Sequence, residues 1–170
     1  MIYEFCAENV TLLEKAMLAG ARRIELCDNL AVGGTTPSYG VTKAAVELAA
    51  NYDTTIMTMI RPRGGDFVYN DLEIAIMLED IRMTAQAGSQ GVVFGVLTAD
   101  KKLDKPNLEK LMAASKGMEI VFHMAFDELS DDDQLEAIDW LSQAGVTRIL
   151  TRAGVSGDSL EKRFAHYHRI

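Results

Sequence analysis

The sequence is poor in cysteine: only Cys6 and Cys27 occur among its 170 residues. Two cysteines are too few for the disulfide framework of a small secreted domain, and the four closely spaced ligands of a structural zinc site are missing. In a reducing compartment, such cysteines are expected to be free thiols or metal ligands.

Long apolar runs and basic clusters are also missing. No eighteen apolar residues follow one another, and the amino terminus has no basic segment followed by an apolar core, so we expect a cytoplasmic protein that does not span a membrane. Acidic residues outnumber Lys and Arg by 25 to 17, which gives a net charge of −8. With no basic cluster, a nucleic acid partner is not expected.

What the sequence does contain fits one soluble globular domain over residues 1–170, with 48% hydrophobic and 25% charged residues. A strand, turn and helix recur, and glycine ends the helix at Gly20, Gly88 and Gly145. We predict strands near 2–6, 23–27, 54–60, 91–96, 118–123 and 147–151. We predict helices near 9–19, 41–51, 71–87, 106–116, 132–143 and 158–168.

Strands that alternate with helices form a parallel sheet, which is either an open doubly wound sheet or a closed barrel. Glu4 and Cys6 share one face of the first strand, and Glu25 and Cys27 share one face of the second. An inward row of polar residues favours the barrel, and the glycine-rich turn of nucleotide-binding doubly wound sheets is missing. We therefore predict a TIM-barrel-like α/β fold, incomplete because it has about six of the eight βα units.

Two arginines follow the third predicted strand, in the run Arg61-Pro62-Arg63-Gly64-Gly65. Pro62 and the glycines end the strand, so both guanidinium groups lie at its carboxyl end, where parallel α/β sheets bind ligands. Arg61 and Arg63 are candidate substrate-binding residues for a small anion. Alternatively, they only pair with nearby carboxylates, and Glu25 is their expected partner.

Three further residues are candidates for acid–base chemistry. Glu25 points inward, where a carboxyl group must be paired, hydrated or protonated. His123 ends the fifth strand on the same face as Val121, and Asp127 lies four residues later, placed to orient the imidazole ring or to bind a ligand. A structural ion pair and a hydrogen-bonded core histidine are the alternatives.

Cys6 and Cys27 lie on neighbouring strands, on one face and at a similar height. Two thiolates brought together suit monovalent copper, which makes both residues candidate copper(I) ligands. Inert buried cysteines are the alternative.

Several motifs together resemble the CutC family over about residues 1 to 151. They are Arg-Ile-Glu-Leu-Cys at 23–27, Gly-Gly-Thr-Thr-Pro-Ser at 33–38, Arg-Pro-Arg-Gly-Gly-Asp-Phe-Val-Tyr at 61–69, Gly-Val-Val-Phe-Gly-Val-Leu-Thr at 91–98 and Phe-His-Met-Ala-Phe-Asp at 122–127. The resemblance implies a TIM barrel, a cytoplasmic location, a homo-oligomer such as a dimer, and a role in copper homeostasis. It also places the copper thiols at Cys6 and Cys27.

The resemblance leaves three expectations for function. The first is copper(I) binding through Cys6 and Cys27, and the second is an enzyme that acts on a small phosphorylated or carboxylated metabolite. Family members continue through a seventh and an eighth strand, whereas this chain ends at Ile170 in the sixth predicted helix. The third expectation is therefore an inactive remnant that lacks the last two βα units. The first and sixth strands of such a remnant would have unpaired edges.

Overall fold

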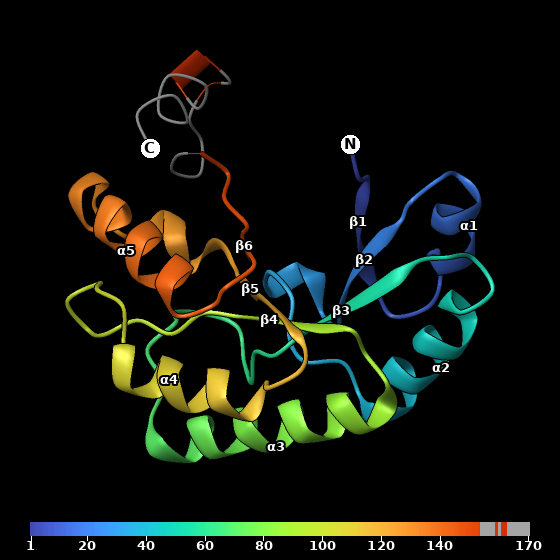
Figure 1. Ribbon diagram of the computed structural model, residues 1–170, viewed down its shortest axis with the longest axis horizontal. Coiled ribbons are helices and arrows are strands. Elements are labelled where there is room, and N and C mark those ends of the chain that lie inside the picture. Colours follow the sequence, from blue (N-terminus) through green and yellow to red (C-terminus); the bar gives the residue numbers. More distant parts are fainter. Residues whose placement is uncertain (154–158, 160, 163–170) are drawn as a thin grey trace.

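Six parallel strands form the sheet of the computed structural model, which describes residues 1–153, 159, 161 and 162. The strands are β1 (Glu4–Glu8), β2 (Arg23–Cys27), β3 (Thr55–Met59), β4 (Gly91–Phe94), β5 (Glu119–Phe122) and β6 (Arg148–Ile149). Each strand pairs with the next one along the chain, and the sheet curls into an arc (Figure 1). A doubly wound sheet would reverse its strand order, so this sequential order confirms the incomplete TIM-barrel-like fold.

Helices cover the convex side of the sheet (Figure 1). They are α1 (Leu13–Leu18), α2 (Tyr39–Ala49), α3 (Asp71–Ala87), α4 (Lys105–Ala114) and α5 (Asp131–Gln143). Most of the sixth predicted helix, including His166 and His168, lies outside the described residues. None of the described helices is both long and apolar enough to cross a bilayer.

Local signals in the sequence explain where these helices begin and end. The α3 helix begins with a capping box, in which Asn70 and Glu73 each accept a hydrogen bond from the other's backbone N–H. As predicted, Gly20, Gly88 and Gly145 all have positive φ, which lets the chain turn sharply at the helix end.

The predicted start of the chain is shifted relative to the structure. Strand β1 covers Glu4–Glu8 and not residues 2–6, and α1 begins only at Leu13. Asn9 follows β1 with a φ of 58°, and its backbone N–H continues the pairing by donating to the Cys27 carbonyl. The pairing of β1 with β2 therefore extends to Asn9, which was predicted as the first residue of a helix.

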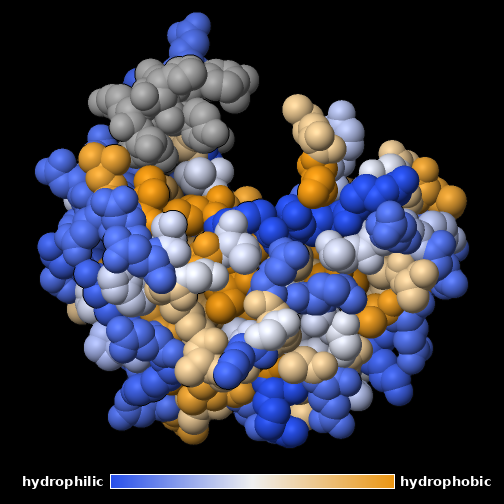
Figure 2. Space-filling view, in the orientation of Figure 1, coloured by the Kyte–Doolittle hydropathy of each residue, from blue (hydrophilic) through white to orange (hydrophobic). Residues whose placement is uncertain are grey.

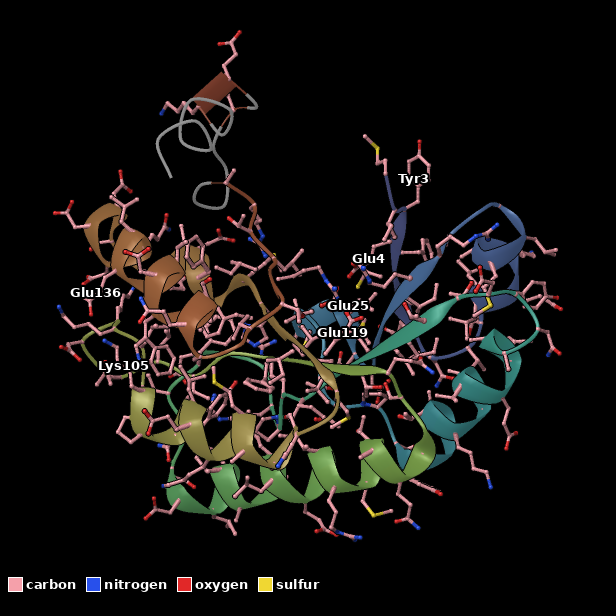
Figure 3. The ribbon with its side chains drawn as sticks, viewed as in Figure 1. Tyr3, Glu4, Glu25, Lys105, Glu119 and Glu136 are labelled. Atoms are coloured by element: carbon pink, nitrogen blue, oxygen red, sulfur yellow. The ribbon has the colours of Figure 1, made fainter. Side chains whose placement is uncertain are left out.

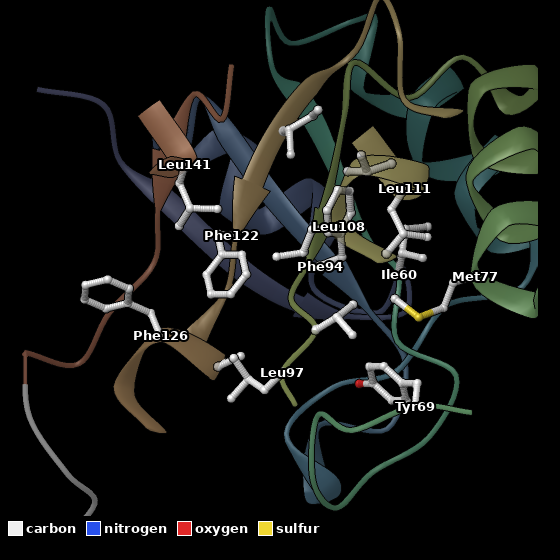
Figure 4. Packing of buried hydrophobic residues seen from close by; sticks show 14 of the residues in the cluster. Ile60, Tyr69, Met77, Phe94, Leu97, Leu108, Leu111, Phe122, Phe126 and Leu141 are labelled. Carbon is white, nitrogen blue, oxygen red and sulfur yellow. The ribbon is translucent and has the colours of Figure 1, made fainter. Parts of the chain in front are cut away.

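Most of the core lies between the sheet and the helices. Ile24 and Leu26 of β2 pack there with residues of α1 and α2, and a larger cluster includes Phe94, Phe122 and Leu108 (Figure 4). A smaller cluster lies on the concave side and consists of Cys27, Met57, Met59, Val93 and Val121. The predicted alternation of β2 is therefore confirmed, with Cys27 inside the arc and its neighbour Leu26 under the helices.

Candidate functional site

A cavity of about 130 Å³ lies inside the curve of the sheet, near the carboxyl ends of the strands. Cys6, Glu25, Cys27, Arg61 and His123 all line it, although they come from four separate parts of the chain. The surface of the molecule is hollowed on this concave side, between the amino-terminal strand and the side that carries α5 (Figure 2). Five of the seven residues predicted for the site therefore meet in one place.

Two thiols and a carboxyl group form the tightest cluster in this cavity. One donor atom from each of Cys6, Glu25 and Cys27 lies within 4.8 Å of the other two. The strand register pairs Cys6 with Glu25, and Cys27 with Glu8, so the cysteines are offset by two residues along the strands and are not level. Their side chains nevertheless reach one another because all three point inward.

Burial changes the acidity of this cluster. Loss of solvent raises the pKa of Glu25, and this outweighs the hydrogen bond from Cys6, which lowers it. Hydrogen bonding with Cys6, together with burial and the charge of Glu25, raises the pKa of the Cys27 thiol far above its ordinary value. The raised pKa values of Glu25 and Cys27 therefore favour the protonated, uncharged forms of these two groups.

Arg61 is buried beside the cluster, with 4% of its surface exposed. Its guanidinium group donates to the carbonyl oxygens of Val32 (2.9 Å), Gly34 (2.9 Å) and Gly65 (2.7 Å). Among the described residues, no carboxylate oxygen lies within salt-bridge distance of it, so the expected ion pair with Glu25 is wrong. The guanidinium group instead fixes the loops that close the cavity.

One of these loops, residues 28–35, covers the cavity with Leu30 and Gly33. Asp28 and Thr35 pair as a short antiparallel bridge at its base, and the Leu30 N–H donates to a Glu8 carboxylate oxygen at 2.5 Å. Gly34 has a φ of 89°, and a Cβ atom there would lie 3.1 Å from the Cys27 sulfur. The loop can approach the thiol this closely only because glycine occupies that position.

Arg63 does not reach the cavity. It forms ion pairs with Glu73 (2.6 Å) and Asp66 (3.0 Å) and donates to three nearby backbone carbonyls. A clamp of two arginines around one ligand is therefore not formed. These contacts of Arg63 instead hold the loop between β3 and α3 in place.

His123 lines the cavity, as the parity of β5 predicted, but Asp127 does not orient it. The Nδ1 atom of His123 accepts a hydrogen bond from the Ala125 N–H at 3.2 Å. Asp127 accepts bonds from the Thr151 hydroxyl and the Arg152 N–H. The 3-10 helix that begins after His123 points Asp127 toward the segment after β6, away from the imidazole ring.

Two further ion pairs inside the arc were missed from the sequence. Arg23 pairs with Glu4 (3.2 Å) and Arg148 pairs with Glu119 (2.6 Å), at the amino-terminal ends of the strands. Figure 3 shows Glu4, Glu25 and Glu119 together inside the curve of the sheet. Strand parity could have predicted that these side chains point inward. Arg23 lies two residues before Glu25, and Glu119 lies two residues before Val121, so each shares the inward face of its strand.

Known proteins share the sequence and the fold of this chain. The family model described as CutC family matches residues 1–164. A family protein CutC from Enterococcus faecalis is 52% identical over 170 residues, which is all of this chain and 81% of the relative. The crystal structure of a CutC protein from Streptococcus agalactiae, named for copper homeostasis, has a TM-score of 0.94 and 46% identity, and the match covers 98% of this chain and 79% of that chain.

More distant structures share only the fold. An archaeal fructose 1,6-bisphosphate aldolase has a TM-score of 0.63 at 15% identity, and the match covers 92% of this chain and 61% of the aldolase. At this identity the likeness supports the TIM-barrel-like class and carries no information about the reaction.

Proposed function

The chain belongs to the CutC family, and from this membership and the cavity we propose that it binds monovalent copper through the thiolates of Cys6 and Cys27, as part of copper homeostasis. The observation that carries the proposal is the Cys6–Glu25–Cys27 cluster, whose donor atoms all lie within 4.8 Å of one another. Two metal–thiolate bonds of about 2.3 Å each span at most about 4.6 Å, so one ion fits between two sulfurs with little movement.

The donor set favours copper(I) over harder or higher-coordinate ions. Soft thiolates select copper(I), whereas structural zinc is held by four ligands, and the cluster among the described residues offers three. Glu25 contributes a hard oxygen atom, which adds little to a two-sulfur copper site. Its carboxyl group would instead support a zinc or copper(II) competitor.

Access and charge also fit this role. Cys6 is exposed and Cys27 is buried, so an ion arriving from the concave side meets Cys6 first and then the deeper thiol. Copper(I) with two thiolates carries one negative charge. The positive charge of the Arg61 guanidinium lies close enough to act on Cys27, where it favours the thiolate and so works against the rise in pKa. The same attraction stabilises the negative charge of copper(I) bound by two thiolates.

The test is a copper(I) titration against a chromogenic chelator under anaerobic, reducing conditions. Wild-type protein is expected to bind one copper per chain with both thiols, and the double variant Cys6→Ser, Cys27→Ser is expected to lose this binding. Met57→Leu is the matched control, because Met57 is a buried inward sulfur that does not line the cavity. Equal affinity of the wild type and the double variant would refute the proposal.

The other expectations for this chain remain predictions. They are the cytoplasmic location, the homo-oligomer, the enzyme that acts on a small anionic metabolite, and the inactive remnant. The enzyme alternative retains Glu25 and His123 in one cavity but loses Arg63 as a second cationic contact.

A further inference from the structure

Arg61 brings a permanent positive charge into the cavity without a negative partner. The three carbonyl groups that it contacts supply dipoles but no charge. Within the described part of the chain, Asp66 and Glu73 are both engaged by Arg63, and Glu25 lies beyond salt-bridge distance. A buried charge is costly unless it is paired, so the interior next to Arg61 favours an anion.

Arg61 also keeps an unused donor. Its Nε atom is buried and has no hydrogen-bond partner among the described residues. A buried donor without an acceptor loses its hydrogen bonds to water without replacement, which is unfavourable. Binding an acceptor atom would remove that cost.

His123 supplies a second donor of the same kind. Since Nδ1 accepts from the Ala125 N–H, the proton of the neutral ring lies on Nε2, and that atom too is buried without a partner in the described structure. Burial and the nearby Arg61 charge lower the His123 pKa to about 3, so the ring stays neutral at physiological pH. The Nε2–H group can therefore donate but adds no charge.

Both side chains pack against one aromatic ring. The Arg61 guanidinium carbon lies 4.9 Å from the centre of the Phe67 ring, and the His123 ring centre lies 4.8 Å from it. All three residues line the same cavity. Two unmet donors, one of them charged, are thus placed around one small space.

We propose that Arg61 and His123 form a subsite for a small monocarboxylate, whose oxygen atoms accept from Arg61 Nε–H and His123 Nε2–H beside the cysteine pair. A single negative charge balances the one guanidinium charge. A volume of about 130 Å³ corresponds to about four waters at roughly 30 Å³ each, which suits an anion of acetate size. Leu30, Phe67 and Leu150 make the rest of the lining apolar, and this suits an alkyl group better than the further oxygen atoms of phosphate.

The direct test is an NMR titration of metal-free, ¹⁵N-labelled wild-type protein with sodium acetate at constant ionic strength. The side-chain resonances of Arg61 Nε–H and His123 Nε2–H are expected to shift together and to saturate. Acetamide, a neutral molecule of the same shape, should leave both resonances in place. The proposal is overturned if neither resonance shifts with acetate, if acetamide shifts them equally, or if only inorganic phosphate saturates the site.

Variants separate this subsite from its surroundings. Arg61→Met should weaken acetate binding at least about tenfold, because a charge-assisted hydrogen bond is lost. Arg63→Met is the matched control, since Arg63 lies outside the cavity, and it should retain wild-type affinity. If Arg61→Met does not fold, the His123→Phe variant is titrated with acetate instead. The Arg61 Nε–H resonance of that variant is followed, and it should respond only weakly. An unchanged response in that variant would overturn the role of His123.

The subsite goes beyond copper binding and can fail independently of it. The Cys6→Ser, Cys27→Ser variant should lose copper(I) and still bind acetate. His123→Phe should respond to acetate only weakly and still bind copper(I) with one ion per chain. Loss of acetate binding in the cysteine variant would refute a subsite that rests on Arg61 and His123.

Discussion

Copper(I) affinity should depend steeply on pH, because the Cys27 thiol must lose its proton to bind the metal. Its pKa is raised far above the ordinary value of about 9, so the thiol is protonated throughout the neutral range. Each ion bound therefore releases one proton from Cys27. Below the thiol pKa, one released proton makes the apparent affinity rise about tenfold, or about 1.4 kcal/mol, per pH unit.

Between pH 6 and pH 8, Cys27 alone should thus strengthen binding about a hundredfold. Competition with a copper(I) chelator whose own pH dependence is known measures this change. Calorimetry in buffers of different ionisation enthalpy counts the released protons independently. Cys27→Ser should remove this contribution, and the remaining affinity should be weaker and flatter with pH. An affinity that changes less than about threefold across this range would show that the thiol does not bind as a thiolate from a buried, protonated state.

Four further outcomes follow from the same structure. The raised Cys27 pKa means that the unfolded chain loses this proton first, so the free energy of unfolding should fall by up to about 1.4 kcal/mol per pH unit above about pH 9, and urea unfolding of Cys27→Ala should lack this slope. The Glu25 pKa is also raised, so stability should decline as pH rises above 4.5, and Glu25→Gln should raise the melting temperature at pH 8 more than at pH 4. The lowered His123 pKa predicts stability that is present above about 6.5 and is lost as pH falls toward about 3, with imidazole NMR signals that do not titrate between pH 5 and 8. Gly34→Ala should cost roughly 1–2 kcal/mol, measured by urea unfolding, because of its positive φ and the Cys27 contact, whereas Gly40→Ala in α2 should cost nothing.

The alternation of strand residues was enough to predict which side chains face the cavity. Glu25 and Cys27 lie two residues apart on β2, as Glu4 and Cys6 do on β1, so each pair shares one face of its strand. The opposite face of β2 packs against α1 and α2, and this leaves the polar face inward. Glycine at the helix ends is likewise a local signal, and Gly20, Gly88 and Gly145 each follow the end of a helix as predicted.

The partners of the long polar side chains were not predictable in this way. Arg61 was expected to pair with Glu25, but the loop at 28–35 offers it carbonyl groups instead. Arg63 turns toward Glu73 on α3, and Asp127 turns toward the segment after β6. These choices depend on where distant loops fold back, and nothing in the local sequence around each residue encodes that position.

By itself, the sequence determined the repeating strand and helix units, the inward row of polar residues and the resemblance to the CutC family, since these depend on periodicity and on short motifs. Tertiary structure alone decided that the two thiols and Glu25 meet within 4.8 Å and that Arg61 is buried without a carboxylate partner in the described structure. The physical reason is that the curvature of the sheet and the fold of its loops set distances between residues far apart in the chain. Burial, and the pKa shifts that follow from it, depend on those distances.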